Sequence, residues 1–218
     1  MFTSIVLVTA AATSILYAFY LLIQPKRIHL LLTALILGVV AFGIACTVQD
    51  LLFAKDMLTL KQINLFSAPL LEELLKAALL ALFIMRIRAI QPGEGAFYGF
   101  ALGVGFAILE SAAYIMSDPS QALNVATARS VSVNLMHGIG IALVGYGIVM
   151  CRQRRLGAMP TIILVATAVV IHASSNFLTN QMGIYGAASA IGLSLAGIML
   201  LALLSKTVMR PIANTAIT

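Results

Sequence analysis

The sequence predicts an all-α protein, a polytopic bundle of about seven transmembrane helices. Of its 218 residues, 61% are hydrophobic and 9% are charged, and the mean hydropathy is +1.07. Water-soluble domains of this length are far less apolar. The apolar residues form seven runs, each near the ~20 residues that a helix needs to cross a bilayer. These runs cover residues 3–23, 29–53, 66–85, 95–116, 127–150, 160–178 and 184–205.

Basic residues lie between the runs and predict the orientation. They form short clusters rather than one amphipathic face, so the net charge of +6 indicates topology and no nucleic-acid partner. Cytoplasmic loops hold the excess of Lys and Arg. One side carries Lys26, Arg27, Arg86, Arg88, Arg152, Arg154, Arg155, Lys206 and Arg210, and the other carries Lys55 and Lys61. We expect an outside N-terminus and a cytoplasmic C-terminus in a multi-pass protein of the plasma (cell) membrane.

The chain is expected to form a single membrane domain over residues 1–218, with a catalytic-like core at about 66–178. No basic residue precedes the first run, and Lys26 and Arg27 follow it, which favours a retained helix over a cleaved signal peptide. The connections are too short to hold a soluble domain. Cys46 and Cys151 match neither a disulfide framework nor a thiolate metal site.

The run 66–85 differs from the others because it holds Glu72, Glu73 and Lys76. On insertion scales a charge at the centre of a membrane helix costs about 2.5–3.5 kcal/mol, so such residues are candidates for function. Glu72 and Lys76 share a helix face. Glu73 lies about 100° around the helix from Glu72, so the two carboxylates are not expected to point directly at the same centre. Glu73 and Lys76 also suit a purely structural ion pair.

Packing between the later helices is expected to depend on small and amide side chains. Gly95, Gly99 and Gly103 recur at four-residue spacing in the run 95–116. They remove the side chains from one helical face and let a neighbouring helix approach closely. Asn134, in the following run, is expected to form a hydrogen bond between helices.

Ionisable residues from four runs lie at similar depths. In the predicted topology Glu72 and Glu110 each lie about six residues, or roughly 9 Å, below the outer surface. His172 lies at about the same depth, and His137 lies roughly 15 Å deep. Carboxylates beside imidazoles in a shielded pocket suit general-base activation of water, with Asn or His donors stabilising an oxyanion. We therefore expect a polar centre in the outer half of the bilayer.

Two further polar residues accompany this centre. Asn176 follows His172 at i+4 and shares its helix face. Arg129 lies near the outer end of its run, where it either snorkels to the interface or pairs with Glu73 or Glu110. The spacing alone does not choose between these partners.

Together these residues form a pattern that resembles the PrsW family of membrane proteases. The pattern is Glu72-Glu73-x-x-Lys76 on one run, Phe106-x-x-x-Glu110 with Tyr114 on the next, Arg129 and His137 on a third, and His172-x-x-x-Asn176 on a fourth. That family is similar in turn to the CAAX prenyl proteases and the bacteriocin-immunity-type membrane proteases. The prenyl protease branch carries Arg one position after Lys76 and His in place of Glu110. Both departures favour the PrsW branch.

The resemblance implies an intramembrane endopeptidase that cuts a membrane-anchored protein near the outer face. In PrsW-type bacterial proteins this substrate is a single-span anti-sigma factor. The implied catalytic residues are Glu72, Glu110, His137, His172 and Asn176, supported by Glu73, Lys76 and Arg129. Within this set Glu72 is the general base on water, while His172 and Asn176 bind the oxyanion. The partners would be the protein substrate and the lipid bilayer.

Other chemistries and functions stay open at this point. Glu72, Glu110, His137 and His172 also suit a mixed oxygen and nitrogen shell for a divalent metal such as Zn²⁺. We prefer the version that requires no cofactor, because the spacing matches no zinc motif and no thiolate is available. A non-catalytic scaffold or binding member of the superfamily is the first alternative. A proton-coupled carrier is the second alternative. It would need a continuous polar path to the cytoplasmic side, and the inner halves of the helices are too apolar for one.

Overall fold

The computed structural model describes residues 1–55, 59, 62–182 and 184–208. Its long helices are α1 (Phe2–Ile23), α2 (Leu31–Ala54), α4 (Ala68–Arg86), α5 (Pro92–Ser117), α6 (Ala122–Arg152), α7 (Ala158–Met182) and α8 (Ile184–Val208). Short helical segments lie between them, namely η1 (Ile28–Leu30), η2 (Ile63–Ser67) and η3 (Pro119–Gln121). The described residues contain no strand, and the predicted all-α bundle is confirmed. Lys61 and Arg210, which entered the topology count, lie outside the described residues.

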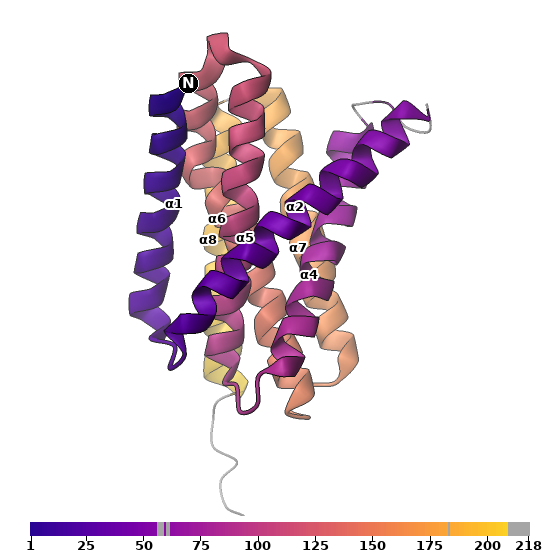
Figure 1. Cartoon of the computed structure of the whole chain (residues 1–218). Coiled ribbons are helices and arrows are strands. Elements are labelled where there is room, and N and C mark those ends of the chain that lie inside the picture. Colours follow the sequence, from indigo (N-terminus) through magenta and orange to yellow (C-terminus); the bar gives the residue numbers. More distant parts are fainter. Residues whose placement is uncertain (56–58, 60–61, 183, 209–218) are drawn as a thin grey trace, which may run out of the picture.

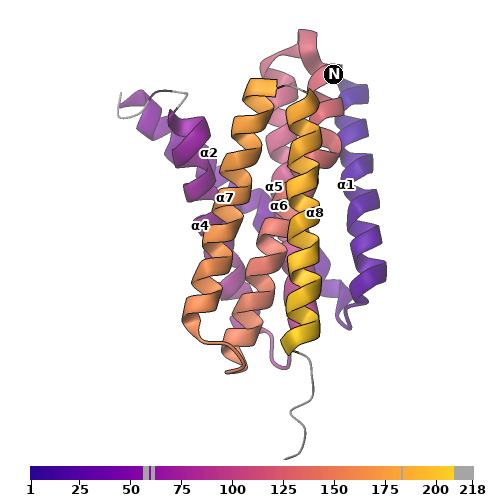
Figure 2. The same ribbon diagram turned by 180° about the vertical axis from the view of Figure 1, so that it is seen from behind.

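Helices α5 and α6 form the centre of the bundle (Figure 1). In the most apolar stretch of α6, 89% of the residues are buried, and in that of α5, 67%. The other candidate spans bury only 17–28%. Helix α1 packs against both central helices, and α7 and α8 cover α6 on the side that faces the viewer in Figure 2. Most of the bundle's core is therefore the contact surface of two helices.

Glycines bring α5 and α6 into backbone contact, as the four-residue spacing predicts. A Cβ atom at Gly103 would lie 2.2 Å from the carbonyl oxygen of His137, and one at Gly99 would lie 2.2 Å from that of Ile141. Real Cβ atoms do not approach this closely, so any larger side chain would push the helices apart. The contact at Gly103 also fixes where His137 stands relative to α5.

Helix α2 crosses α5 obliquely and continues over α4 (Figure 1). Two glycines make the crossing close. A Cβ atom at Gly38 would lie 2.1 Å from the carbonyl oxygen of Leu102, and one at Gly105 would lie 2.3 Å from that of Leu35. Beyond this crossing, the second half of α2 passes over the α4–α5 side of the bundle.

Helix α4 carries more charged residues than any other long helix. Six of the long helices among the described residues are long and apolar enough to cross a membrane. Helix α4 has 19 residues, and its charged residues Glu72, Glu73, Lys76 and Arg86 set it apart. Five of its seven buried residues lie in its first half, and they include both glutamates and the lysine. The charged part of α4 therefore faces protein rather than lipid.

A π-helical turn, η2, leads into α4. Pro69 lies in the first turn of α4, where its missing N–H costs no helical bond. In a regular α-helix, however, the proline ring would clash with the carbonyl of Leu65, four residues earlier. The wider turn of η2 relieves this clash. Such π turns are frequent at functional sites, and this one ends at Ser67, five residues before Glu72.

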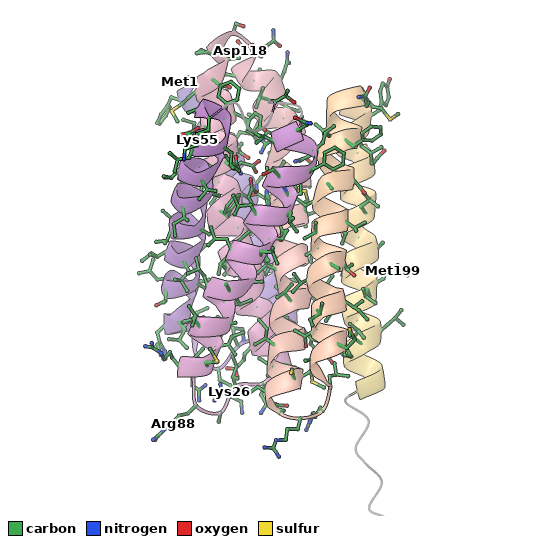
Figure 3. All side chains as sticks on the ribbon, turned by 90° about the vertical axis from the view of Figure 1, so that its right-hand side faces the viewer. Met1, Lys26, Lys55, Arg88, Asp118 and Met199 are labelled. Atoms are coloured by element: carbon green, nitrogen blue, oxygen red, sulfur yellow. The ribbon has the colours of Figure 1, made fainter. Side chains whose placement is uncertain are left out.

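The two ends of the bundle differ in their loops. Lys26 and Arg88 lie at one end, and Met1, Lys55 and Asp118 lie at the other (Figure 3). At the Lys26 end, Arg152 donates to the carbonyls of Ile84 and Ile87 at 2.6 and 2.7 Å. Some basic side chains there also hold the loops together. That this end faces the cytoplasm stays a prediction from the positive-inside rule.

Candidate active site

Four helices bring their polar side chains to one buried centre. Glu73 and Lys76 come from α4, Glu110 from α5, His137 from α6 and His172 from α7. Each of these side chains belongs to a residue that is at most 9% exposed. Polar groups buried this deeply are stable only when they meet partners. The contacts between them therefore define the site.

Glu73 lies at the middle of the centre. Its Oε1 accepts a hydrogen bond from Lys76 Nζ at 2.6 Å and another from His172 Nδ1 at 2.9 Å. Lys76 and Glu73 thus form a buried ion pair within α4, and neither charge is left uncompensated. The lysine also meets His137 Nδ1 at 2.6 Å. This single lysine joins α4 to α6.

The hydrogen bond from Glu73 determines the tautomer of His172. We assign the proton of this ring to Nδ1, because Glu73 accepts from that atom. The other ring nitrogen, Nε2, then carries a lone pair. It faces Glu72 Oε2 at 3.9 Å, and neither atom has a hydrogen-bond partner among the described residues. Two acceptors face each other across a gap that suits a water molecule or a cation.

Glu72 and Glu73 do not point at the same atom, yet both lie beside the imidazole of His172. Glu73 contacts His172 at Nδ1, and Glu72 faces the same ring at Nε2. The 100° step between consecutive residues places the two carboxylates on opposite edges of one imidazole. The width of the ring lets two diverging side chains reach one partner.

His137 occupies the other half of the centre. We assign its proton to Nε2, because Lys76 donates to Nδ1 and Glu110 Oε2 lies 2.9 Å from Nε2. Arg129 Nη2 lies 2.8 Å from the same oxygen of Glu110. Of the partners considered for Arg129, the structure therefore selects Glu110. The imidazole joins the two ion pairs, Lys76–Glu73 and Arg129–Glu110, into one network.

Aromatic side chains cover the cationic groups of this network. Lys76 Nζ lies 4.1 Å from the centroid of the Phe106 ring, and the Arg129 guanidinium lies 4.0 Å from that of Tyr114. Such contacts stabilise a cation that has lost its water. The Phe106–Glu110–Tyr114 stripe of α5 thus surrounds one carboxylate with two rings, each of which holds one basic residue.

Gln49 of α2 is a member of the site that the sequence did not indicate. Its Nε2 donates to Glu72 Oε1 at 3.0 Å. This bond leaves the other carboxylate oxygen, Oε2, directed toward His172. A glutamine in an apolar run gives little signal by itself. Its partner became visible only because α2 crosses α5 and reaches α4.

A cavity of about 130 Å³ lies beside Glu72, between α2, α4, α5 and α7. We call it the α2-side cavity. Cys46, Gln49, Glu72, Glu110, Tyr114 and Asn176 are among the residues that line it. Water takes about 30 Å³ per molecule in the liquid, so the cavity has room for about four. Glu72 and Glu110 therefore lie beside the cavity, while Glu73, Lys76, His137 and His172 are enclosed by protein.

The two asparagines differ in their placement. Asn176 lies on α7, one turn after His172, and lines the α2-side cavity. Asn134 does not fulfil the expected role between helices. Its Nδ2 donates to the carbonyl of Ser130, within α6, at 2.6 Å. The amide is fully buried, and its Oδ1 has no hydrogen-bond partner among the described residues.

The residues present are compatible with a divalent metal. One ligand atom from each of Glu72, His137 and His172 lies within 4.8 Å of the others. Glu72 Oε2 and His172 Nε2 are the readiest ligands, because they are buried and have no hydrogen-bond partner among the described residues. Carboxylate oxygen and imidazole nitrogen are ligands that Zn²⁺ accepts. Both ring nitrogens of His137 have partners, Lys76 and Glu110, so His137 would first have to release one of them.

The fold and the site together define a class: a multi-pass membrane protein with a buried carboxylate–imidazole centre beside a small cavity. Over residues 26–205 the chain matches the PrsW family of intramembrane metalloproteases, and it belongs to that family. It is therefore an intramembrane protease. Searches of curated proteins and of solved structures gave no match. The family match extends to α2 and so includes Gln49.

Proposed function

We propose that the protein hydrolyses a peptide bond of a membrane-anchored protein, with Glu72 as the general base on the attacking water. One observation carries this proposal: Glu72 Oε2 and His172 Nε2 face each other at 3.9 Å beside a cavity. A water molecule between them would donate one hydrogen to each acceptor. Its oxygen would then be directed toward a peptide carbonyl in the cavity.

The reaction on this proposal needs only groups of the chain. Glu72 takes a proton from the water as its oxygen bonds to the carbonyl carbon, and negative charge develops on the carbonyl oxygen. Asn176, which lines the cavity, would donate to that oxyanion. Glu72 then returns the proton to the leaving nitrogen, and the carbon–nitrogen bond breaks. A general base of this kind contributes typically 10²–10⁴-fold to the rate.

The network around Glu73 would position these groups. Glu73 fixes the His172 tautomer, and Lys76 balances the charge of Glu73. His137 links this pair to Glu110. Because these four residues are paired with one another, we place them as positioning residues and leave the chemistry to Glu72, His172 and Asn176.

A metal-dependent version uses the same centre. Glu72 and His172, with His137 as a third ligand, would hold a divalent cation. When bound, such an ion makes its water a stronger acid and polarises the scissile carbonyl. Asn176 keeps its role on the oxyanion in both versions. Metal analysis of the purified protein and of a Glu72→Gln, His172→Ala double variant separates them: bound metal that this variant loses supports the metal-dependent version.

The substrate on this proposal is a single-span membrane protein, and an anti-sigma factor is the case that the family suggests. Cleavage is tested by co-expressing single-span model proteins and detecting their fragments. We expect cleavage by the wild-type protein, none by Glu72→Gln and full activity of Asp50→Asn. Asp50 is exposed on α2 beside Gln49, so it controls for loss of a nearby carboxylate. Full activity of a folded Glu72→Gln protein would overturn the proposal and favour a scaffold or carrier.

A further inference from the structure

A second cavity adjoins the site on the side opposite α2. It has a volume of about 200 Å³ and lies between α5, α6, α7 and α8. We call it the α6-side cavity. Tyr114 and Asn176 line both cavities, so these two residues form the wall between them. At about 30 Å³ per molecule, the α6-side cavity has room for about six waters.

The two cavities have opposite charge. The α2-side cavity is lined by Glu72 and Glu110, and no Lys or Arg is among its described lining residues. The α6-side cavity is lined by Arg129, and its described lining includes no Asp or Glu. The guanidinium and the Glu110 carboxylate pair across the wall beside Tyr114. The pair is therefore divided between the two cavities.

Hydroxyl groups add a second asymmetry. Ser132, Ser175 and Thr179 line the α6-side cavity. Each donates its proton to a carbonyl of its own helix, at 2.5 to 2.8 Å. Their oxygens therefore offer lone pairs to the cavity, which suits a group that donates a hydrogen bond, such as a peptide N–H or a neutral polar side chain.

We propose that the two cavities are the substrate subsites on either side of the scissile bond, and that their opposite charges select the residues that flank it. This inference rests on the proposed function. An extended peptide that crosses the wall at Asn176 would place its scissile carbonyl beside Glu72. One flank would enter the α2-side cavity and the other the α6-side cavity.

The charges predict what each subsite rejects. A substrate Lys or Arg in the α6-side cavity would face the largely buried guanidinium of Arg129. A substrate Asp or Glu in the α2-side cavity would face Glu72 and Glu110 in the same way. Like charges repel most strongly where water does not screen them. We expect neutral or acidic residues at one flank and neutral or basic residues at the other.

Thr179 provides the sharpest test, because it lines the α6-side cavity and is only partly buried. The probe is a library of single-span model proteins with randomised residues at the outer end of the span, co-expressed with the full-length chain. The cleaved bonds are read by mass spectrometry. Thr179→Glu should raise the frequency of Lys and Arg at one flank about tenfold, the size of one good charge-assisted contact. Thr179→Gln, whose side chain has the shape of Glu without the charge, should not raise this frequency. Neither variant should change the residues accepted at the other flank.

A second variant covers the case in which Thr179→Glu does not fold. Ala190 is buried on α8 and lines the same cavity, so Ala190→Leu should narrow the accepted residues at that flank to small ones. If both variants fold and their sequence preferences are unchanged, the subsite proposal is wrong. The proposed function would still stand in that case, provided that the wild type cleaves and Glu72→Gln does not. If the wild-type chain cleaves no library member, the proposed function fails and the subsites fail with it.

Discussion

Helices α6 and α2 both pack against α5, yet the two contacts differ in kind. Gly95, Gly99 and Gly103 of α5 keep this helix in backbone contact with α6 over several turns. Helix α2 meets α5 closely at one crossing, near Gly38 and Gly105. The most apolar stretch of α6 is 89% buried, and that of α2 is 22% buried. One contact is an extended seam and the other is a single crossing.

This difference divides the site between a tightly packed part and a loosely packed part. His137 and Glu110 lie on α6 and α5, where close backbone contacts between the two helices fix their relative position. Glu72 receives its hydrogen bond from Gln49, on the part of α2 beyond the crossing. The positioning network is therefore built largely into the core, whereas the proposed base depends partly on a helix whose most apolar stretch is only 22% buried.

The largest expected effect comes from breaking the α5–α6 seam. Gly103→Leu would drive a side chain into the backbone of His137, and we expect a loss of more than about 5 kcal/mol, enough to prevent folding. Gly192→Leu is the control, because a Cβ there meets nothing within 4 Å. Thermal unfolding in detergent measures both. A stable Gly103→Leu protein would show that the seam is not essential.

Removing the lysine from the buried network comes next. Lys76→Met leaves the Glu73 carboxylate buried without its cation, and we expect a loss of about 3–5 kcal/mol. Adding Glu73→Gln to the same chain should restore much of the stability, because no buried charge then lacks a partner. Comparable unfolding temperatures for the wild type and Lys76→Met would contradict the buried ion pair.

A smaller effect is expected on the α2 side of the comparison. Gln49→Met keeps the length of the side chain and removes the donor to Glu72, a charge-assisted bond of about 1.5–3 kcal/mol. We expect kcat for a cleaved model substrate to fall about tenfold or more with little change in KM. Equal losses for Gln49→Met and the exposed neighbour Asp50→Asn would indicate a general effect on α2 instead.

The smallest effect tests how loosely α2 is packed away from its crossing. A Cβ at Gly43 meets nothing within 4 Å, whereas one at Gly38 would overlap the backbone of Leu102. Gly43→Ala should leave activity unchanged and raise stability by up to about 1 kcal/mol through helix propensity. Gly38→Ala should destabilise. Similar unfolding temperatures for the two variants would mean that α2 is held evenly along its length.

The sequence could predict the helices and the meeting of their polar residues, because hydropathy and helical spacing depend on local composition. The seven apolar runs correspond to the seven long helices, and Glu110, His137 and His172 meet near Glu72 and Glu73. Side-chain reach was harder to predict, as His172 between two carboxylates shows. Gln49 could not be predicted, because its contact depends on the angle at which α2 crosses α5.

The division of roles between the two neighbouring glutamates is the central claim. Glu72 is placed beside the cavity as the base, and Glu73 is enclosed as the residue that positions His172. The most direct measurement compares Glu72→Gln and Glu73→Gln for cleavage of one model substrate and for thermal stability. We predict a folded Glu72→Gln protein whose activity is at least about 10²-fold lower, and a less stable Glu73→Gln protein that keeps measurable activity. A folded Glu72→Gln protein as active as the wild type, beside an inactive Glu73→Gln protein of normal stability, would contradict the account.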